Sequence, residues 1–156
     1  MNLDNYKIIG TGKTKIYSND ENRTHNLFQA SNSINNYIVG PAEIFSFNKT
    51  LGERTEENGY KLAESIDNKK IVKTIGGGIC QVSTTLNKAV KDAKLEVIEA
   101  HKHSKSVDYS KPEDEAAVVY GQLDYRFKNN RSKPVKIVSK VDIDNMEVIV
   151  KIYEEV

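Results

Sequence analysis

The chain has 156 residues, of which 38% are hydrophobic and 29% are charged, a balance typical of a globular domain rather than of a disordered segment. Its net charge of +1 comes from 23 basic and 22 acidic residues, so it lacks the basic excess that favours nucleic acid as a partner. No apolar run approaches the roughly 18 residues of a membrane span, and no signal-peptide core follows Met1. We therefore expect contact with a membrane only through a segment outside this chain.

The N-terminal half alternates between extended and helical patterns. Residues 5–17 alternate as a strand pair or as one long strand, and residues 19–38 carry apolar side chains at helical spacing behind several candidate caps. Residues 40–52 indicate a turn, a short strand and a loop. The alternating runs 60–66 and 71–75 are separated by a turn signal, so they predict a β-hairpin.

The C-terminal half contains a second helix and further strands. Apolar residues recur every three or four positions from about Cys80 to Ala93, and residues 95–104 then alternate as a strand. Residues 116–130 predict one or two strands broken near Gly121, and residues 134–153 predict a hairpin. The pattern indicates a single α+β domain over residues 1–156, with a mixed or antiparallel sheet and two main helices, one of which starts at the glycine-rich Cys80 motif.

The run "GTGKT" at residues 10–14 resembles the end of a phosphate-binding loop. The full pattern needs a glycine five positions before Gly12, where this chain has Lys7, and a helix after Thr14, where the sequence predicts a strand and a turn. We therefore expect no nucleotide site there.

The run "GGGICQVSTTL" at residues 76–86 contains the single cysteine of the chain, Cys80. Three consecutive glycines before a helix leave the first-turn N–H groups uncovered, ready to bind an anion or a developing oxyanion. The alternatives are a tight turn and a cysteine buried as a small hydrophobic residue. A helix N-terminus and a nearby imidazolium would both lower the pKa of a thiol. The residues of this candidate oxyanion loop are Gly76, Gly77, Gly78, Ile79 and Gln81.

Two histidines, His101 and His103, follow the second helix on the predicted strand. A helix of 14 residues is roughly 21 Å long, and a strand from Leu95 to His103 covers roughly 26 Å, so the histidines can reach the helix start beside Cys80. Because they are two residues apart on a strand, they should face the same side, and either could be the base. The alternatives are a solvated strand end and a partial metal site of Cys80 and the two histidines, with His25 as a further ligand.

Several quoted segments together resemble the VanW domain family. They are residues 45–60 ("FSFNKTLGERTEENGY"), 76–86, 99–104 ("EAHKHS") and 120–130 ("YGQLDYRFKNN"), in the order and spacing of that family, and "NRTHN" at 22–26 is similar as well. The resemblance covers residues from about Asn22 to Tyr153. Glu115 stands where members often have an aspartate, so the resemblance assigns it no role.

The resemblance implies a protein of the Gram-positive cell envelope, from a family named after glycopeptide-antibiotic resistance. It implies a cysteine L,D-transpeptidase that forms 3-3 cross-links between peptidoglycan stem peptides, with Cys80 as nucleophile and His103, or else His101, as the base. From the charge balance and the ligand spacing we also expect no nucleic-acid partner and no metal or other cofactor. The alternatives are a noncatalytic module that binds peptidoglycan or a partner protein, and a cysteine hydrolase of wall peptides.

Further polar residues are candidates for substrate binding. Arg54 or Arg126 could hold a stem carboxylate, although an ordinary Asp124–Arg126 surface pair is an equal alternative. Helix capping and surface polarity are the alternative for the residues at the helix start. The full set expected to bind substrate is Ser83, Thr84, Ser104, Arg54, Tyr125, Arg126 and Asp124.

Overall fold

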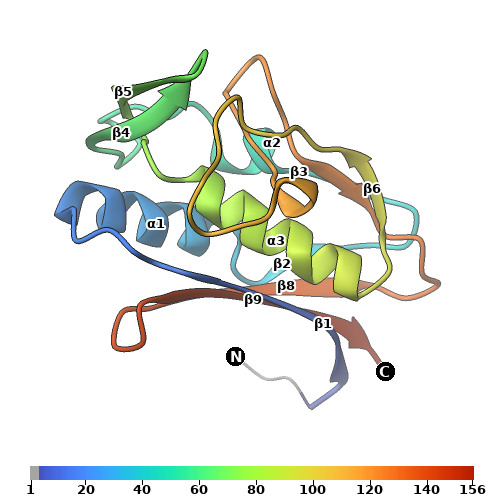
Figure 1. Cartoon of the computed structure of the whole chain (residues 1–156). Coiled ribbons are helices and arrows are strands. Elements are labelled where there is room, and N and C mark those ends of the chain that lie inside the picture. The colour runs from blue at the N-terminus through green and yellow to red at the C-terminus, as the bar shows by residue number, and fades with distance from the viewer. Residues whose placement is uncertain (1–3) are drawn as a thin grey trace.

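A computed structural model describes residues 4–156, which form an α+β arrangement with antiparallel strand pairing throughout the described sheets (Figure 1). This confirms the fold class expected from the sequence. The elements in chain order are β1 (Tyr6–Lys15), α1 (Glu21–Ile34), β2 (Tyr37–Val39), β3 (Ile44–Ser46), α2 (Phe47–Leu51), β4 (Leu62–Asp67), β5 (Lys70–Ile75), α3 (Cys80–Asp92), β6 (Glu96–Glu99), a 3-10 turn at Pro112–Asp114, β7 (Arg126–Lys128), β8 (Val135–Asp142) and β9 (Glu147–Glu155).

The largest sheet has the strand order β1-β9-β8-β2 and carries most of the core. Alternate residues of β9, namely Val148, Val150 and Ile152, are fully buried, as the period of two predicts for a strand with one covered face. Helices α1 and α3 lie on the same side of this sheet (Figure 1). A second sheet has the order β3-β7-β6, and β4 pairs with β5 as the predicted hairpin.

The "GTGKT" segment lies within β1, as the sequence predicted. A Cβ atom at Gly10 would clash with the carbonyl oxygen of Ala89, and one at Gly12 would clash with that of Thr85. These glycines therefore let the backbone of β1 approach the backbone of α3 closely. Their role is helix–strand packing.

Three predicted segments differ from the structure. The helix expected over residues 19–38 ends at Ile34, because Asn36 turns the backbone with a φ of 66°, and Tyr37–Val39 forms the strand β2. The strand expected over residues 95–104 ends at Glu99, and residues 116–130 form only β7 and an isolated bridge between Val119 and Leu123. After Glu99 the loop backbone bonds to side chains in place of a neighbouring strand. The His103 N–H donates to Glu115, Ser83 of α3 donates to the Ala116 oxygen, and Thr84 of α3 accepts from the Ala116 N–H. The result is a long loop between β6 and β7 that passes in front of α3 in Figure 1.

A further difference lies at residues 47–51, which form the short helix α2 rather than a loop. Ser46 caps it, because its Oγ accepts a hydrogen bond of 3.1 Å from the Lys49 N–H. In the described part of the chain, no helix is long and apolar enough to cross a membrane.

Candidate active site

The three glycines that connect β5 to α3 are required by close packing. Gly76 and Gly78 have φ of 93° and 99°, which favours glycine strongly. Cβ atoms at the three positions would clash with Arg54, with the Ala63 backbone and with Arg23. One glycine would suffice for a turn, so the run reflects three separate contacts.

Cys80 is the first residue of α3, and its thiol lies against the backbone of the loop between β6 and β7. The sulfur is 3.5 Å from the Val118 nitrogen and 3.6 Å from the Val118 oxygen. No side chain caps this helix, whose N-cap is Ile79. Within residues 4–156, the N–H groups of Gly78 and Cys80 have no hydrogen-bond partner, whereas those of Gly76, Gly77, Ile79 and Gln81 donate to backbone carbonyls.

His103 is buried beside Cys80 and is held by Glu115. Its Nδ1 lies 2.6 Å from Glu115 Oε1, and its backbone N–H donates to the same oxygen at 2.8 Å. The His103 and Glu115 side chains are only 6% and 3% exposed, so water hardly screens this pair. Since Nδ1 is engaged, Nε2 is the ring nitrogen left for the thiol, and it lies 3.4 Å from the Tyr109 hydroxyl.

The pKa values of Cys80 and His103 move in opposite directions. Burial alone would raise the pKa of the Cys80 thiol, but the hydrogen bond and the charge of His103, the Val118 backbone and the charge of Arg54 lower it overall. Burial alone would lower the pKa of His103, but the hydrogen bonds and charges of Cys80 and Glu115 raise it overall. Both shifts favour a thiolate paired with an imidazolium.

Glu115 is the member of this candidate site that the sequence did not predict. Buried polar side chains of α3 fix its segment: Ser83 Oγ donates to the Ala116 oxygen at 2.6 Å, and Thr84 Oγ1 accepts from the Ala116 N–H at 3.1 Å. The frequent aspartate at this place in the family was the available signal. The replacement of that aspartate by a longer carboxylate led us to assign it no role.

His101 does not share the surroundings of His103, contrary to expectation. The strand ends at Glu99, so the two histidines do not face one side of a strand. His101 Nε2 instead lies 2.8 Å from Glu99 Oε2, and its side chain is 36% exposed. Of the two rings, only His103 contributes to the pKa shift of Cys80.

Most of the residues expected to bind substrate are engaged elsewhere. Arg126 donates to Glu99 at 3.0 Å, Asp124 accepts from Ser46 and from the Asn48 N–H at the start of α2, and the fully buried Tyr125 hydroxyl donates to Asn87. These three side chains therefore stabilise the fold and are not free to bind a ligand. Ser83 and Thr84 are fully buried, so they do not face solvent either.

Arg54 and Gln81 also have defined partners. Arg54 donates to Asn48 and to the Gly52 oxygen, and burial lowers the pKa of its guanidinium. Gln81 is buried and accepts a hydrogen bond of 2.8 Å from Arg23. Ser104, by contrast, lines the cavity described next.

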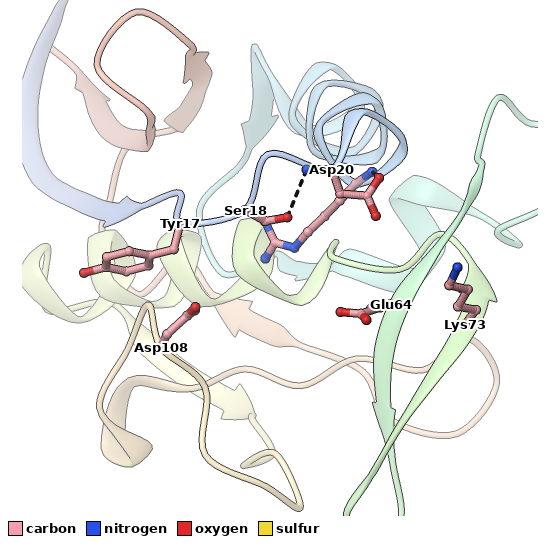
Figure 2. A pocket seen from close by; sticks show the side chains of 7 residues that line it. Tyr17, Ser18, Asp20, Glu64, Lys73 and Asp108 are labelled. Atoms are coloured by element: carbon pink, nitrogen blue, oxygen red, sulfur yellow. Dashed lines mark hydrogen bonds between the residues drawn. The ribbon is translucent and has the colours of Figure 1, made fainter.

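The thiol opens onto a cavity of about 480 Å³ between the β4–β5 hairpin and the loop that follows β6. Cys80, His103, Ser104 and Tyr109 are among the residues that line it. A second cavity of about 410 Å³ is lined by Tyr17, Ser18, Asp20, Arg23, Glu64, Lys73 and Asp108 (Figure 2). Arg23, Glu64 and Asp108 line both cavities, so the two adjoin, and together they are called the groove.

The geometry gives no metal centre in the described region. Among residues 4–156, no group of three or more His, Cys, Asp or Glu side chains could hold a metal ion. His25, considered as a further ligand, instead bonds to the Gly59 oxygen at 2.7 Å.

The fold and the site define an α+β domain with a Cys–His–Glu cluster at the start of a helix. The chain belongs to the VanW family, because the family model described as "VanW like protein" matches residues 22–153. This confirms the resemblance seen in the sequence motifs.

Two curated relatives are similar to the chain. It is 39% identical over 132 residues to the "Uncharacterized protein YoaR" of Bacillus subtilis (strain 168), covering 85% of this chain and 44% of the relative. It is 25% identical over 151 residues to the "Vancomycin B-type resistance protein VanW" of Enterococcus faecalis (strain ATCC 700802 / V583), covering 93% of this chain and 53% of the relative. The chain thus spans about half the length of these relatives. No solved structure matches it significantly.

Proposed function

We propose that the protein is a cysteine L,D-transpeptidase of the bacterial cell envelope, which joins peptidoglycan stem peptides by 3-3 cross-links. The observation that carries the proposal is the Cys80–His103–Glu115 cluster, with its thiol at a cavity and its pKa values shifted toward an ion pair. A nucleophile, a base that activates it and a third group that orients the base are the parts of a covalent acyl-transfer site. The VanW family and its relative named for vancomycin resistance support the envelope setting.

In the first half-reaction the Cys80 thiolate attacks the carbonyl carbon of the residue before the terminal D-alanine. A C–S bond forms, the C–N bond breaks, and the His103 imidazolium gives its proton to the departing amine. The products are free D-alanine and a thioester on Cys80. Glu115 holds the ring through Nδ1, so that Nε2 carries the transferred proton.

Two N–H groups can stabilise the negative charge on the attacked oxygen. Gly78 and Cys80 have free N–H groups at the start of α3, within residues 4–156. Donors held in place before the reaction need no rearrangement in the transition state, which makes them effective. The other N–H groups of the predicted oxyanion loop already donate to carbonyls.

In the second half-reaction a side-chain amine of another stem attacks the thioester. Neutral His103 takes a proton from this amine, a C–N bond forms, and the C–S bond breaks. The Cys80 thiolate and the His103 imidazolium are thereby restored. Water in place of the amine would give hydrolysis.

Incubation of the full chain with a defined disaccharide tetrapeptide tests the proposal. We expect mass spectrometry to detect a thioester on Cys80, release of D-alanine and cross-linked dimers. Cys80→Ala should keep its melting temperature within a few degrees and lose all three products.

The alternatives give other outcomes. Trimmed monomers without dimers would indicate a hydrolase, and binding without any acyl-enzyme would indicate a noncatalytic module. Release of D-alanine by Cys80→Ala at the wild-type rate would exclude Cys80 as the nucleophile.

A further inference from the structure

Arg23, in the first turns of α1, reaches the start of α3. A Cβ at Gly78 would meet the Arg23 Cγ, so the arginine side chain passes directly over this glycine. Its Nη2 donates to Gln81 Oε1 at 2.8 Å, and its Cζ lies 6.0 Å from the centre of the Tyr109 ring. Arg23 thus contacts residues on both sides of Cys80 in the sequence.

The guanidinium of Arg23 is held firmly but is not neutralised. Gln81 is itself fixed, since its Nε2 donates to Thr14 Oγ1 at 3.0 Å and to the Lys15 oxygen at 2.9 Å. Within residues 4–156, Arg23 forms no ion pair, and its Nη1 is buried without a hydrogen-bond partner. A buried donor without a partner is costly, so a ligand that supplies an acceptor would be bound favourably.

The other arginines near the site differ in this respect. Arg54 bonds to Asn48 and to the Gly52 oxygen, and Arg126 is paired with Glu99. Arg23 also lines both cavities, which neither of the other two does. It is therefore the guanidinium best placed to meet a ligand in the groove.

We propose that Arg23 binds the C-terminal carboxylate of the donor peptide, that is, of the residue that leaves when Cys80 is acylated. This inference rests on the proposed function. The terminal carboxylate lies one residue beyond the attacked carbonyl, and one residue spans at most about 3.6 Å. Arg23 lies over Gly78, two residues before Cys80, and a planar guanidinium matches a carboxylate with two parallel hydrogen bonds.

The charges around Arg23 suit an end group that is small and singly charged. Glu64 and Asp108 line the same two cavities, and Lys73 and Asp20 line the second (Figure 2). None of these carboxylates forms an ion pair with the Arg23 guanidinium, although Asp20 accepts a hydrogen bond of 3.3 Å from the Arg23 backbone N–H. They instead disfavour a more highly charged anion in the groove.

The test compares donor tetrapeptides that end in a free carboxylate or in a carboxamide. We expect wild-type protein to acylate Cys80 about 10- to 100-fold faster with the acid than with the amide. Arg23→Gln should lose this preference, because the acylation rate with the acid falls more than the rate with the amide, and Arg23→Lys should show an intermediate preference. Arg126→Gln, which removes an arginine paired elsewhere, should retain the wild-type preference.

Equal rates for acid and amide in the wild type, or a retained preference in Arg23→Gln, would overturn the inference. If Arg23→Gln does not fold, the ratio of the acylation rates with the acid and with the amide is compared between the wild type and Arg23→Lys. An equal ratio in the two proteins then overturns the inference. If no peptide acylates the protein, the proposed enzymatic function fails, and binding of both peptides to Cys80→Ala then tests Arg23 separately. A tighter Kd for the acid, lost in Cys80→Ala/Arg23→Gln, supports the carboxylate site, and equal or absent binding overturns it.

Discussion

Helix α3 contacts β1 on one side and the loop that carries the site on the other, and the two contacts differ in kind. Toward β1 the helix backbone packs closely against the backbone of Gly10 and Gly12, and hydrogen bonds of Gln81 and Thr85 with Thr14 and Lys15 join the two elements near the helix start. Toward the loop, Ser83, Thr84 and Asn87 bond to backbone atoms of residues 114–116.

The contact with β1 mainly stabilises the fold, whereas the contact with the loop positions the residues of the candidate site. Apolar contacts are tolerant of direction, so they build a stable framework from a periodic pattern. Hydrogen bonds require defined distances and angles, so they position Glu115 and Val118 around Cys80 without regular secondary structure. We therefore expect substitutions on the loop side to alter reactivity and those on the sheet side to alter stability.

The largest expected effect concerns the two histidines. His103→Gln should slow formation of the proposed acyl-enzyme by about 10²- to 10⁴-fold, since it removes the proposed general acid. His101→Gln, which alters a ring bonded to Glu99, should change this rate less than about threefold. Intact-mass kinetics measure both. Equal losses in the two variants would refute the distinction.

On the sheet side, Gly12→Ala should destabilise the fold by about 2–3 kcal/mol, because the new Cβ clashes with the Thr85 oxygen. Thr11→Ala, next to it with an exposed side chain, should cost less than about 0.5 kcal/mol. Denaturant unfolding gives both values. If the free energy of unfolding of Gly12→Ala equals that of the wild type, close packing of β1 on α3 does not contribute to stability.

On the loop side, Glu115→Gln should lower the pKa of His103 and so raise the pKa of Cys80, since the imidazolium loses its carboxylate partner. Less thiolate is then present at pH 6, and alkylation by iodoacetamide should slow by about tenfold. Glu113→Gln, in the same loop but exposed, should leave the rate unchanged. A rate profile of Glu115→Gln that overlays the wild-type profile would remove Glu115 from the cluster.

The smallest expected effect lies at the outer edge of the loop. Bonds from His101, the Asp124 N–H and Arg126 lower the pKa of Glu99 to about 2. Its contribution to stability, about 0.5–1 kcal/mol, is therefore present above an unfolded pKa of about 4.3 and is lost as the pH falls through about 2. The difference in unfolding free energy between wild type and Glu99→Gln should shrink between pH 5 and pH 2.

Glu96→Gln, at an exposed side chain of the same strand, is the matched control and should show no such pH dependence. If the Glu99→Gln difference stays constant down to pH 2, the bonds to Glu99 do not affect its titration.

The sequence predicted the framework well because periodicity encodes it. Helix α3 and the hairpins β4–β5 and β8–β9 follow the expected segments, Cys80 begins α3 as expected, and α1 lies within the expected helix but ends earlier, at Ile34. The loop between β6 and β7 was mistaken for strands, because alternation at residues 95–104 cannot reveal that ladder pairing stops at Glu99. Glu115 was missed for a related reason. Its position depends on buried bonds from Ser83 and Thr84 to the backbone of the adjacent Ala116, and such bonds have no periodic signature.

The first and last strands lie side by side, since Tyr6 of β1 pairs with Glu155 of β9 and Val156 donates to the Asn5 oxygen at 2.7 Å. Asn5 and Val156 thus lie together at one edge of the large sheet, away from the β4–β5 hairpin (Figure 1). A tether attached at this edge would leave the groove accessible to a long, immobile polymer. Purification tags at either end should for the same reason be tolerated equally.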